Sequence, residues 1–415
     1  MVKNKIKIKI NKILWEKALK KVESDFCRKY SKTDSLLLIM LMGLYKSNDK
    51  LRSSDNLYLV IENPEQLSPQ AYVYMTIAVY DGLLDMLQMR HPFFTYSKLI
   101  ETVIVDYLLL TRDFYTDAIS PLYTIIGSKN HTMQKATATA VDNMKINHQS
   151  FSLVDSCCAT GSLFFGLKTY RWKSVILNDL NPLRTNFLNV LKKEPLKLIK
   201  KILETDFRFI KKTDIKNSSI KEFKLSVNEY ATLRANYTKV DCNVDIAYKM
   251  FVLQCINKAQ IEDGDAIINR TLRFLPAHLK LQIAIITQQD CLKLIENDDV
   301  NKLVLLDVPY IGSEHTCSVD GYKYAPFHQK VAECLHRARY PFLYFCRSTP
   351  PKIDKNYDVA NGSYIMKMKL AQYFFNKGYF FEKVHLEKDT ELLISNNLYN
   401  PKSQFKWVDI STDLT

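Results

Sequence analysis

The chain has 415 residues, of which 47% are hydrophobic and 25% are charged, so its composition is that of a globular protein with room for two or three domains. Its formal net charge of +14 favours a polyanionic partner, with nucleic acid first and an anionic membrane second. A Lys-rich solvated surface is the alternative explanation, because Lys, Asn and Ile are common throughout the chain.

Cysteine spacing and apolar runs exclude several classes of protein. The nine cysteines form no Cys-x-x-Cys pair and no Cys/His cluster with zinc spacing, so we expect no metal site and the reduced thiols of a cytosolic protein. Residues 1–10 lack the apolar core and the cleavage site of a signal peptide. The longest apolar run, Leu36–Tyr45, has about half of the length that a membrane span needs. We therefore expect a soluble, cytoplasmic protein with no membrane partner.

Residues 1 to about 115 are predicted to be mostly helical and to form an accessory domain. Apolar residues recur at helical spacing over Ile13–Val22, with Lys between them. Further helices are expected at Leu36–Tyr45, at about Pro69–Met89 and at Tyr96–Leu110. The residues of this region form no constellation that indicates a chemistry.

From residue 151 onward, strands alternate with helices, which is the pattern of a doubly wound α/β domain with an antiparallel end. Strands are expected at Phe151–Val154, Ser174–Asp179, Leu281–Thr287, Leu303–Leu306, Pro341–Cys346, Tyr379–Glu387 and Glu391–Ser395. Helices are expected at Thr132–Met144, Leu163–Leu167, Asn181–Lys193, Asp245–Lys258, Phe327–Arg337 and Ser363–Asn376. We assign residues 116–195 and 281–415 to this domain.

A turn of small residues, Asp155–Ser162, follows the first strand and precedes an apolar helix. A strand, a small-residue turn and a helix make up the first βα unit of a nucleotide-type site, where the ligand approaches the backbone and the helix N-terminus. The turn does not match Gly-x-Gly-x-x-Gly, and no Lys follows Gly161. A phosphate-binding P-loop is therefore excluded.

Two further positions suit a nucleoside ligand. Asp179 ends the second strand, 24 positions after Asp155, and an acid near this spacing can accept hydrogen bonds from both ribose hydroxyls. A helix cap is an equally good explanation of this residue. Upstream, the turn Gly127–Lys129 offers backbone N–H groups and a cation to a carboxylate, although an ordinary turn is the simpler explanation.

Residues 196–280 are strongly basic and are predicted to form the nucleic-acid face. Lys and Arg are interleaved there with aromatic residues such as Phe207 and Tyr230, and such cations contact phosphates. The candidate contacts are Lys200, Lys201, Arg208, Lys211 and Lys212. A charged insertion with a small core of its own is the alternative.

The run Leu303–Leu306 is uniformly apolar, as expected of a strand that is buried on both faces, and it leads into the tetrad Asp307–Tyr310 (Asp-Val-Pro-Tyr). In doubly wound domains, ligands bind at the carboxyl ends of the strands. A carboxylate, a rigid turn and an aromatic ring at that place can hold a flat polar ligand. Taken alone, an acidic residue before such a turn is more often structural.

In this order, the motifs resemble those of the Dam-like adenine-N6 DNA methyltransferases, the alpha group of S-adenosylmethionine-dependent enzymes, over about residues 120–400. Asn178–Pro182 is a close match to the family's Asn-Asp-Ile-Asn-Pro. The other motifs that carry the resemblance are Ser120–Leu122 with Gly127–Lys129, Val154–Ser162, Asp290, Asp307–Tyr310 and Glu391–Asn396. The resemblance implies a Rossmann-like class I methyltransferase sheet, with residues 196–280 as an inserted target-recognition region.

The resemblance also implies a reaction and its catalytic residues. A methyl group passes from S-adenosylmethionine to the exocyclic amino nitrogen of an adenine that is flipped out of duplex DNA. Asp307 and the carbonyl of Val308 accept the two N–H groups of that nitrogen, Pro309 stiffens the turn, and Tyr310 stacks on the base. The family serves restriction–modification systems, and the presence of a partner nuclease is left open.

The residues that the resemblance assigns to the cofactor lie around the turn after the first strand. They are Lys129, Asp155, Cys157, Ala159, Gly161, Asp179 and Asp290. Among them, Asp179 is expected to hold the ribose, Asp290 the adenine amino group and Lys129 the carboxylate. The cofactor carries its own leaving group, so the protein supplies position and electrostatics and needs no metal.

Three residues depart from the family's pattern. Cys157 stands where the family has Phe, Ala159 where it has the first Gly, and Val308 where it has the first Pro of the tetrad. The family's Asn-x-x-Phe-Asn-Gly pattern is absent between residues 200 and 280. The departures at these three residues leave open a methyltransferase-like nucleic-acid-binding protein with weak or no turnover. A second alternative is an amino methyltransferase that acts on RNA or protein, because related tetrads serve such amines and amides.

Overall fold

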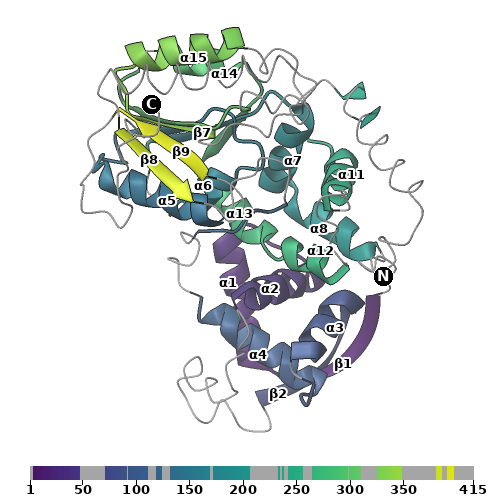
Figure 1. The fold of residues 1–415 in the computed structure, drawn as a ribbon. Helices are drawn as coiled ribbons and strands as arrows, with labels where there is room; N and C mark the ends of the chain where they lie inside the picture. The colour runs from purple at the N-terminus through teal and green to yellow at the C-terminus, as the bar shows by residue number, and fades with distance from the viewer. Residues whose placement is uncertain are drawn as a thin grey trace. The chain divides into compact units, whose positions relative to one another are not determined.

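The structure is a computed structural model that describes residues 3–46, 71–90, 92–110, 118–123, 131–168, 172–205, 232–233, 236–237, 242–255, 264–297, 299–309, 325–347, 380–385 and 390–396. The chain forms two compact units (Figure 1). One unit comprises Met1–Tyr115, Val190–Leu233 and Cys242–Leu281, and the other comprises Thr116–Asn189, Arg234–Asp241 and Gln282–Thr415. None of the described helices is both long and apolar enough to span a bilayer.

The first unit combines a two-stranded antiparallel ribbon with helices. Its strands are β1 (Lys3–Asn11) and β2 (Tyr72–Tyr80). Its helices are α1 (Lys12–Phe26), α2 (Lys32–Lys46), α3 (Asp81–Arg90), α4 (Tyr96–Leu108), α8 (Pro195–Glu204), α11 (Val244–Cys255), α12 (Gly264–Thr271) and α13 (Phe274–Leu281).

The sequence itself explains the start of this unit. In β1, Ile8 and Ile10 are buried while Lys5, Lys7 and Lys9 are exposed, which is the two-residue period of a strand with one face in the core. Asn11 ends the strand and caps α1, because its Oδ1 accepts hydrogen bonds from the backbone N–H groups of residues 13 and 14 at 3.0 and 3.1 Å.

The prediction of a helix at Pro69–Met89 is wrong over its first half, where the chain forms β2, and α3 begins only at Asp81. The segment Tyr72–Tyr80 is rich in β-branched and aromatic residues, which favour strands, and it pairs with β1 along its whole length. The region 1–115 therefore contains a two-stranded ribbon in addition to the predicted helices. The alternation of Lys and Ile over residues 3–10 has the two-residue period of a strand, and this signal already indicates the first strand of the ribbon.

Residues before position 115 share a core with helices from the basic region 196–280. Helix α8 buries one apolar stripe, and Lys200 on its other side forms an ion pair of 2.6 Å with Asp34 of α2. From α13, the His278 ring stacks on Phe26 of α1 with the ring centroids 6.1 Å apart. These segments, far apart in sequence, thus belong to one compact unit.

The second unit contains a seven-stranded sheet in the order β5-β4-β3-β6-β7-β9-β8. Its strands are β3 (Ser152–Asp155), β4 (Ser174–Asn178), β5 (Ala284–Thr287), β6 (Lys302–Leu306), β7 (Phe342–Arg347), β8 (Phe380–His385) and β9 (Thr390–Ser395). The helices that belong to it are α5 (His131–Asn143), α6 (Ser162–Gly166), the first residues of α7 (Pro182–Lys193), α14 (Cys291–Ile295) and α15 (Ala325–Arg337). The expected helix at Ser363–Asn376 lies outside the described residues.

Strands β5, β4, β3, β6 and β7 are parallel, whereas β9 runs antiparallel to both of its neighbours. Figure 1 shows α14 and α15 on one side of this sheet and α5 on the other. Under α15, Phe327, Val331 and Leu335 pack on Val304 and Phe342 of the central strands. The predicted α/β fold with an antiparallel end is confirmed, and its strand order is that of a Rossmann-like methyltransferase sheet.

The order of the strands reverses at β3, because β4 follows it on one side and β6, which comes later in the chain, lies on the other. Such a reversal leaves a crevice at the carboxyl ends of the strands, and ligands of doubly wound domains bind there. The turns after β3, β4, β5 and β6 therefore meet at one edge of the sheet.

Candidate active site

The turn after β3 depends on two residues in the left-handed region of backbone space. Gly161 has φ +70°, and a Cβ at this position would lie 2.7 Å from the ring of Phe165. Ala159 has φ +50°, a conformation that is unfavourable for a residue with a Cβ. The N–H of Gly161 closes the turn by donating to the carbonyl of Cys158 at 2.6 Å. The backbone thus keeps the shape of a Gly-rich turn, although Ala stands at one of its special positions.

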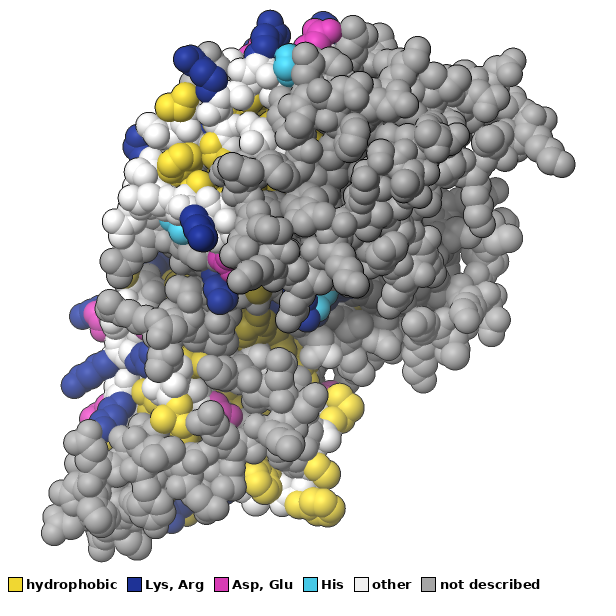
Figure 2. Space-filling model, turned by 60° about the vertical axis from the view of Figure 1, so that its left-hand side comes forward, with side chains coloured by type: hydrophobic (Ala, Val, Ile, Leu, Met, Phe, Trp, Pro, Cys, Tyr) yellow, Lys and Arg dark blue, Asp and Glu magenta, His cyan; other side chains and the backbone are white. Residues whose placement is uncertain are grey.

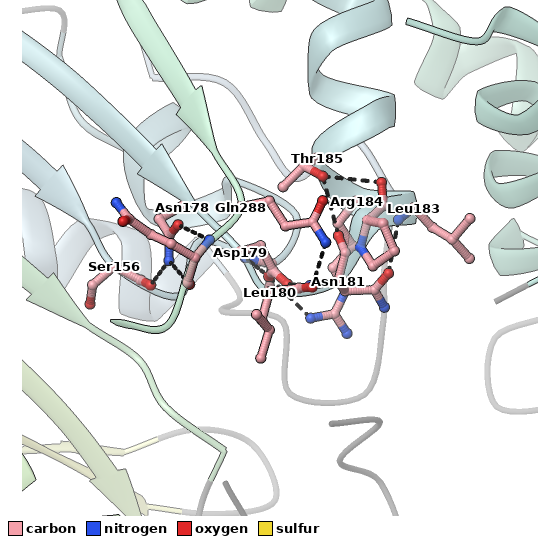
Figure 3. Close-up of polar contacts among 12 residues, drawn as sticks. Ser156, Asn178, Asp179, Leu180, Asn181, Leu183, Arg184, Thr185 and Gln288 are labelled. Carbon is pink, nitrogen blue, oxygen red and sulfur yellow. Dashed lines mark hydrogen bonds and ion pairs between the residues drawn. The ribbon is translucent and has the colours of Figure 1, made fainter. Parts of the chain in front are cut away.

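Asp179, directly after β4, organises this turn and the start of α7 (Figure 3). Its Oδ2 accepts hydrogen bonds from the backbone N–H of Ala159 at 2.8 Å and from Nη1 of Arg184 at 3.2 Å. Its Oδ1 accepts the N–H of Asn181 at 2.8 Å. A carboxylate has about four acceptor positions, so about one is left for a ligand hydroxyl. The side chain is 7% exposed.

Asn178, the last residue of β4, joins three of the turns. Its Nδ2 donates to the carbonyls of Ser156 and Gln289, both at 2.9 Å. Its Oδ1 accepts from Oγ1 of Thr287 at 2.9 Å and from the N–H of Gln289 at 3.0 Å. Both donor positions and both acceptor positions of this buried amide are therefore used, which fixes the turns after β3 and β5 against β4.

Asp155, the last residue of β3, is completely buried, and neither of its carboxylate oxygens has a hydrogen-bond partner among the described residues. Burial, with the nearby negative charges of Asp307 and Asp179, raises the pKa of this carboxyl well above its ordinary value. The backbone N–H of Phe164 makes no hydrogen bond of normal geometry with Asp155. Its positive end favours the ionised carboxylate and lowers the pKa, but burial and the two acids outweigh this effect. A buried acceptor without a donor indicates a place where a cationic or hydrogen-bonding ligand can be stabilised.

Asp307 and Pro309 follow β6 and are both half-buried, while the side chain of Val308 is 1% exposed in the cluster under α15. The neighbouring turn is tied to this strand, because the N–H and the Oγ of Ser156 both donate to the carbonyl of Leu305 at 3.0 Å. In the turn after β6, packing of the Val308 side chain restrains the backbone at the position where the family has a proline ring.

The other predicted cofactor residues lie at the same edge of the sheet. Asp290 caps α14, and its Oδ1 accepts the N–H of Leu292 at 3.0 Å. Cys157 is half-buried against the cluster that contains Cys291. A hydrogen bond with Cys291, together with burial, raises the pKa of the Cys157 thiol well above its ordinary value. These residues all lie at the carboxyl end of one of the strands β3 to β6 or in the segment that follows it; they are Asp155, Cys157, Ala159, Gly161, Asp179, Asp290 and Asp307.

The predicted nucleic-acid contacts Lys200 and Lys201 lie on α8, in the other compact unit. Lys200 pairs with Asp34, and Lys201 pairs with Asp245 while its Nζ lies 5.4 Å from the ring centroid of Tyr248. The remaining predicted site residues, which are Lys129, Arg208, Lys211, Lys212 and Tyr310, fall outside the described residues. In the part of the chain that is described, no cluster of His, Cys, Asp and Glu could hold a metal ion.

Two residues of the site have no role in the sequence-based prediction. Asn178 belongs to the motif Asn178–Pro182, and its place at the end of a buried strand marks an amide that needs partners. Three of its four bonds, however, involve residues more than 100 positions away. Arg184 lies five positions after Asp179, in the first turn of α7, where an Arg can reach back to an acid before the helix. That local spacing is the signal by which Arg184 could have been found.

Comparison with protein families shows to which family this chain belongs. Residues 126–339, just over half of the chain, match the model of the D12 class N6 adenine-specific DNA methyltransferases. The match includes the turns after β3, β4, β5 and β6, so it confirms the resemblance that the motifs indicate. A search of curated proteins gave no match to this chain. The chain belongs to the family of D12 class N6 adenine-specific DNA methyltransferases, which use S-adenosylmethionine to methylate adenine in DNA.

Proposed function

We propose that Asp307 and the backbone carbonyl of Val308 form the clamp with which this DNA adenine methyltransferase activates its target nitrogen. The observation that carries the proposal is the position of residues 307–309 directly after β6. Strand β6 is the neighbour of β3, and the strand order reverses at β3. The turn that is expected to bind the cofactor follows β3. Donor and acceptor of the methyl group can therefore meet at one edge of the sheet.

The chemistry explains why a carboxylate and a carbonyl suit this role. The lone pair of an exocyclic adenine nitrogen is delocalised into the ring, which makes the nitrogen a poor nucleophile. Hydrogen bonds from its two N–H groups to Asp307 and to the Val308 carbonyl favour a pyramidal nitrogen with its lone pair directed at the methyl group. Burial of the Val308 side chain supports the clamp by holding its backbone in place.

We further propose that the turns after β3, β4 and β5 hold S-adenosylmethionine, which supplies an activated methyl group. The residues present fit such a ligand. Asp155 is a buried carboxylate without a donor among the described residues, and it suits a ligand that carries positive charge. Asp179 keeps about one acceptor position for a ribose hydroxyl. Asp290, between β5 and α14, is the candidate for the adenine. Lys129 is the candidate for the cofactor's carboxylate.

The expected substrate is an adenine that is flipped out of duplex DNA, because the amino group is not accessible to this edge of the sheet while the base is stacked. Tyr310 is the candidate for stacking on the flipped base. The segment 196–280, with Arg208, Lys211 and Lys212, is the candidate for target recognition, and its basic composition supports contacts with phosphates.

The test is methyl transfer by the purified chain from radiolabelled S-adenosylmethionine to separate pools of DNA, RNA and protein. We expect label in DNA at adenine N6. Asp307→Ala is expected to lower kcat/KM by at least about a hundredfold, because one acceptor of the reacting nitrogen is lost, and to leave the cofactor Kd within about threefold.

The matched control is Asp85→Ala, which removes an exposed acid of α3 and is expected to keep full activity. Loss of cofactor binding in Asp307→Ala would contradict the assigned role. Label in RNA or protein but not in DNA would point to one of the alternative substrates instead.

A further inference from the structure

The β1–β2 ribbon carries a row of cations on one face. Lys5, Lys7 and Lys9 of β1 are exposed, and their register partners on β2 are Ala78, Thr76 and Tyr74. Thr76 is exposed as well, and Tyr74 is 68% exposed. We define this set, Lys5, Lys7, Lys9, Tyr74 and Thr76, as the ribbon face. It lies before residue 126, outside the segment that matches the methyltransferase family.

The opposite face of the ribbon fixes its orientation. Ile8, Ile10, Ile77 and Val79 point to that side and are at most 8% exposed. The ribbon packs with this side against α1 to α4 of its own unit. Since the side chains of a strand alternate between its two faces, burial of the isoleucines holds all three lysines on the solvent side.

Aromatic rings lie near two of the three lysine ammonium groups of the ribbon face, those of Lys7 and Lys9. Nζ of Lys7 lies 5.3 Å from the ring centroid of Tyr74. Nζ of Lys9 lies 5.5 Å from the centroid of Tyr72 and 5.9 Å from that of Tyr74. A cation over an aromatic ring remains charged and exposed to an anion on its other side. The rings therefore position the charges without neutralising them.

These lysines differ from those of α8 in their partners. Lys200 and Lys201 pair with Asp34 and Asp245. Among the described residues, by contrast, no carboxylate forms an ion pair with Lys5, Lys7 or Lys9. Figure 2 shows one face of the molecule, on which Lys and Arg side chains project from the surface at many points and acidic side chains at fewer. The positive charge of the ribbon face is thus available to an external anion.

The spacing of the row matches a regular polyanion. Every second residue of a strand is displaced by about 6.8 Å, and a DNA strand carries one phosphate for about every 3.4 Å of helix axis. Successive lysines are therefore about two nucleotides apart along the axis. Two-stranded ribbons also have dimensions that DNA grooves accept.

We propose that the ribbon face binds the phosphate backbone of the DNA substrate. The proposal rests on the DNA methyltransferase function and extends it to a surface outside the catalytic domain. The occupant is duplex DNA, because the enzyme's substrate is the polyanion whose charge complements the row. Such contacts raise affinity for any sequence and carry no base specificity.

The test compares the full-length protein with the variant Lys5→Gln/Lys7→Gln/Lys9→Gln in binding to a labelled mixed-sequence duplex, without cofactor, over a range of salt concentrations. We expect at least about tenfold weaker binding near physiological salt and a slope of log K against log salt that is smaller by about two to three. The variant Lys5→Arg/Lys7→Arg/Lys9→Arg keeps the charges and is expected to bind like the wild type.

A charge-matched control is Lys135→Gln/Lys173→Gln/Lys293→Gln, which removes three exposed lysines of the other unit. Equal effects of the two Gln variants would overturn the proposal, because only net charge would then matter. An unchanged salt slope in the ribbon variant would also overturn it. So would a loss of binding to phosphatidylserine vesicles or to single-stranded RNA with duplex binding intact.

The binding experiment is independent of the clamp at Asp307. If the ribbon variant binds DNA as expected but the wild-type chain transfers no label to DNA, DNA binding by the ribbon face is supported and the proposed catalytic role fails. If label is transferred and depends on Asp307 but the salt slope is unchanged, the catalytic role is supported and the ribbon proposal fails. If both proposals hold, the ribbon variant is expected to have a higher KM for DNA than the wild type and an unchanged kcat at saturating DNA.

Discussion

The backbone N–H of Ala159 donates a hydrogen bond of 2.8 Å to Oδ2 of Asp179. This bond joins the turn after β3 to the turn after β4, the two turns that are expected to surround the cofactor. It forms with Ala159 at φ +50°, in the left-handed region. The carboxylate therefore stabilises a backbone conformation that the side chain of Ala159 disfavours.

Ala159→Gly is expected to stabilise the protein. The left-handed conformation costs an L-residue about 1–2 kcal/mol, whereas the greater freedom of Gly in the unfolded chain offsets about 0.4–1 kcal/mol of the gain. The free energy of unfolding, measured with urea, should rise by about 0.5–1 kcal/mol. Ala136→Gly in α5 is the control. It should lower the same quantity by at least about 1 kcal/mol, because there Gly replaces a buried Ala in a helix. A loss of stability in Ala159→Gly would contradict the role of this backbone strain.

Most of the second unit could be predicted from the sequence, because its signals are local. The apolar run before Asp307 is a strand with every residue buried, and the acids Asp155 and Asp179 are close to the ends of their strands as expected. The period of each run and the residue at its end depend only on neighbours in sequence. The resemblance to a known family added the expectation of a Rossmann-like sheet, whereas the order of its strands comes from the structure.

What could not be predicted depends on contacts between distant residues. Strand β2 forms where a helix is predicted, because its partner β1 lies about 70 positions earlier in the chain and tertiary pairing decides between the two conformations. The bonds of Asn178 to Thr287 and Gln289 likewise join residues that are more than 100 positions apart. No pattern within a short window specifies such partners.

Arg184→Gln is expected to destabilise the protein by about 1–2 kcal/mol, because it removes a charge-assisted hydrogen bond to a buried carboxylate that keeps two backbone donors. Lys200→Gln is the matched comparison. Its ion pair with Asp34 is more exposed, with 32% and 24% of the two side chains accessible, so its loss should cost less than about 1 kcal/mol. Urea unfolding of both variants checks the difference, and a larger loss in Lys200→Gln would contradict it.

Asp155→Asn is expected to change how stability depends on pH. Burial and the neighbouring acids raise the pKa of Asp155 in the folded protein above the value of about 3.9 in the unfolded chain. A raised folded pKa means that this group's contribution is fully present below the unfolded pKa and is lost as the pH rises toward the folded pKa. The wild type should therefore lose up to about 1.4 kcal/mol per pH unit relative to the Asn variant, from about pH 4 upward to the folded pKa.

Urea unfolding of the cofactor-free protein between about pH 4 and about pH 7 measures this difference. Asp85→Asn, at an exposed position of α3, is the control and should run parallel to the wild type. If Asp155→Asn also ran parallel to the wild type, the raised pKa of Asp155 would be contradicted.

Asn178→Asp is expected to be the most damaging of these changes. The two side chains have the same shape, but a carboxylate cannot donate to the carbonyls of Ser156 and Gln289, and it places a charge at a site that is 1% exposed. Two carbonyls that lose their donor and one buried charge should together lower the free energy of unfolding by about 3–5 kcal/mol. Cofactor affinity should fall as well, because Asn178 fixes the turns that are expected to bind the cofactor.

Asn181→Asp is the matched control for this substitution, since Asn181 lies three positions later and is also 1% exposed. Its Oδ1 accepts the N–H of Leu183 at the start of α7, a role that Asp can keep, while its Nδ2 has no partner among the described residues. A negative charge at a helix N-terminus is also favourable, so the cost should be less than half of that in Asn178→Asp. Equal losses in the two variants, measured by urea unfolding, would show that buried charge alone decides the effect and that the four bonds of Asn178 do not.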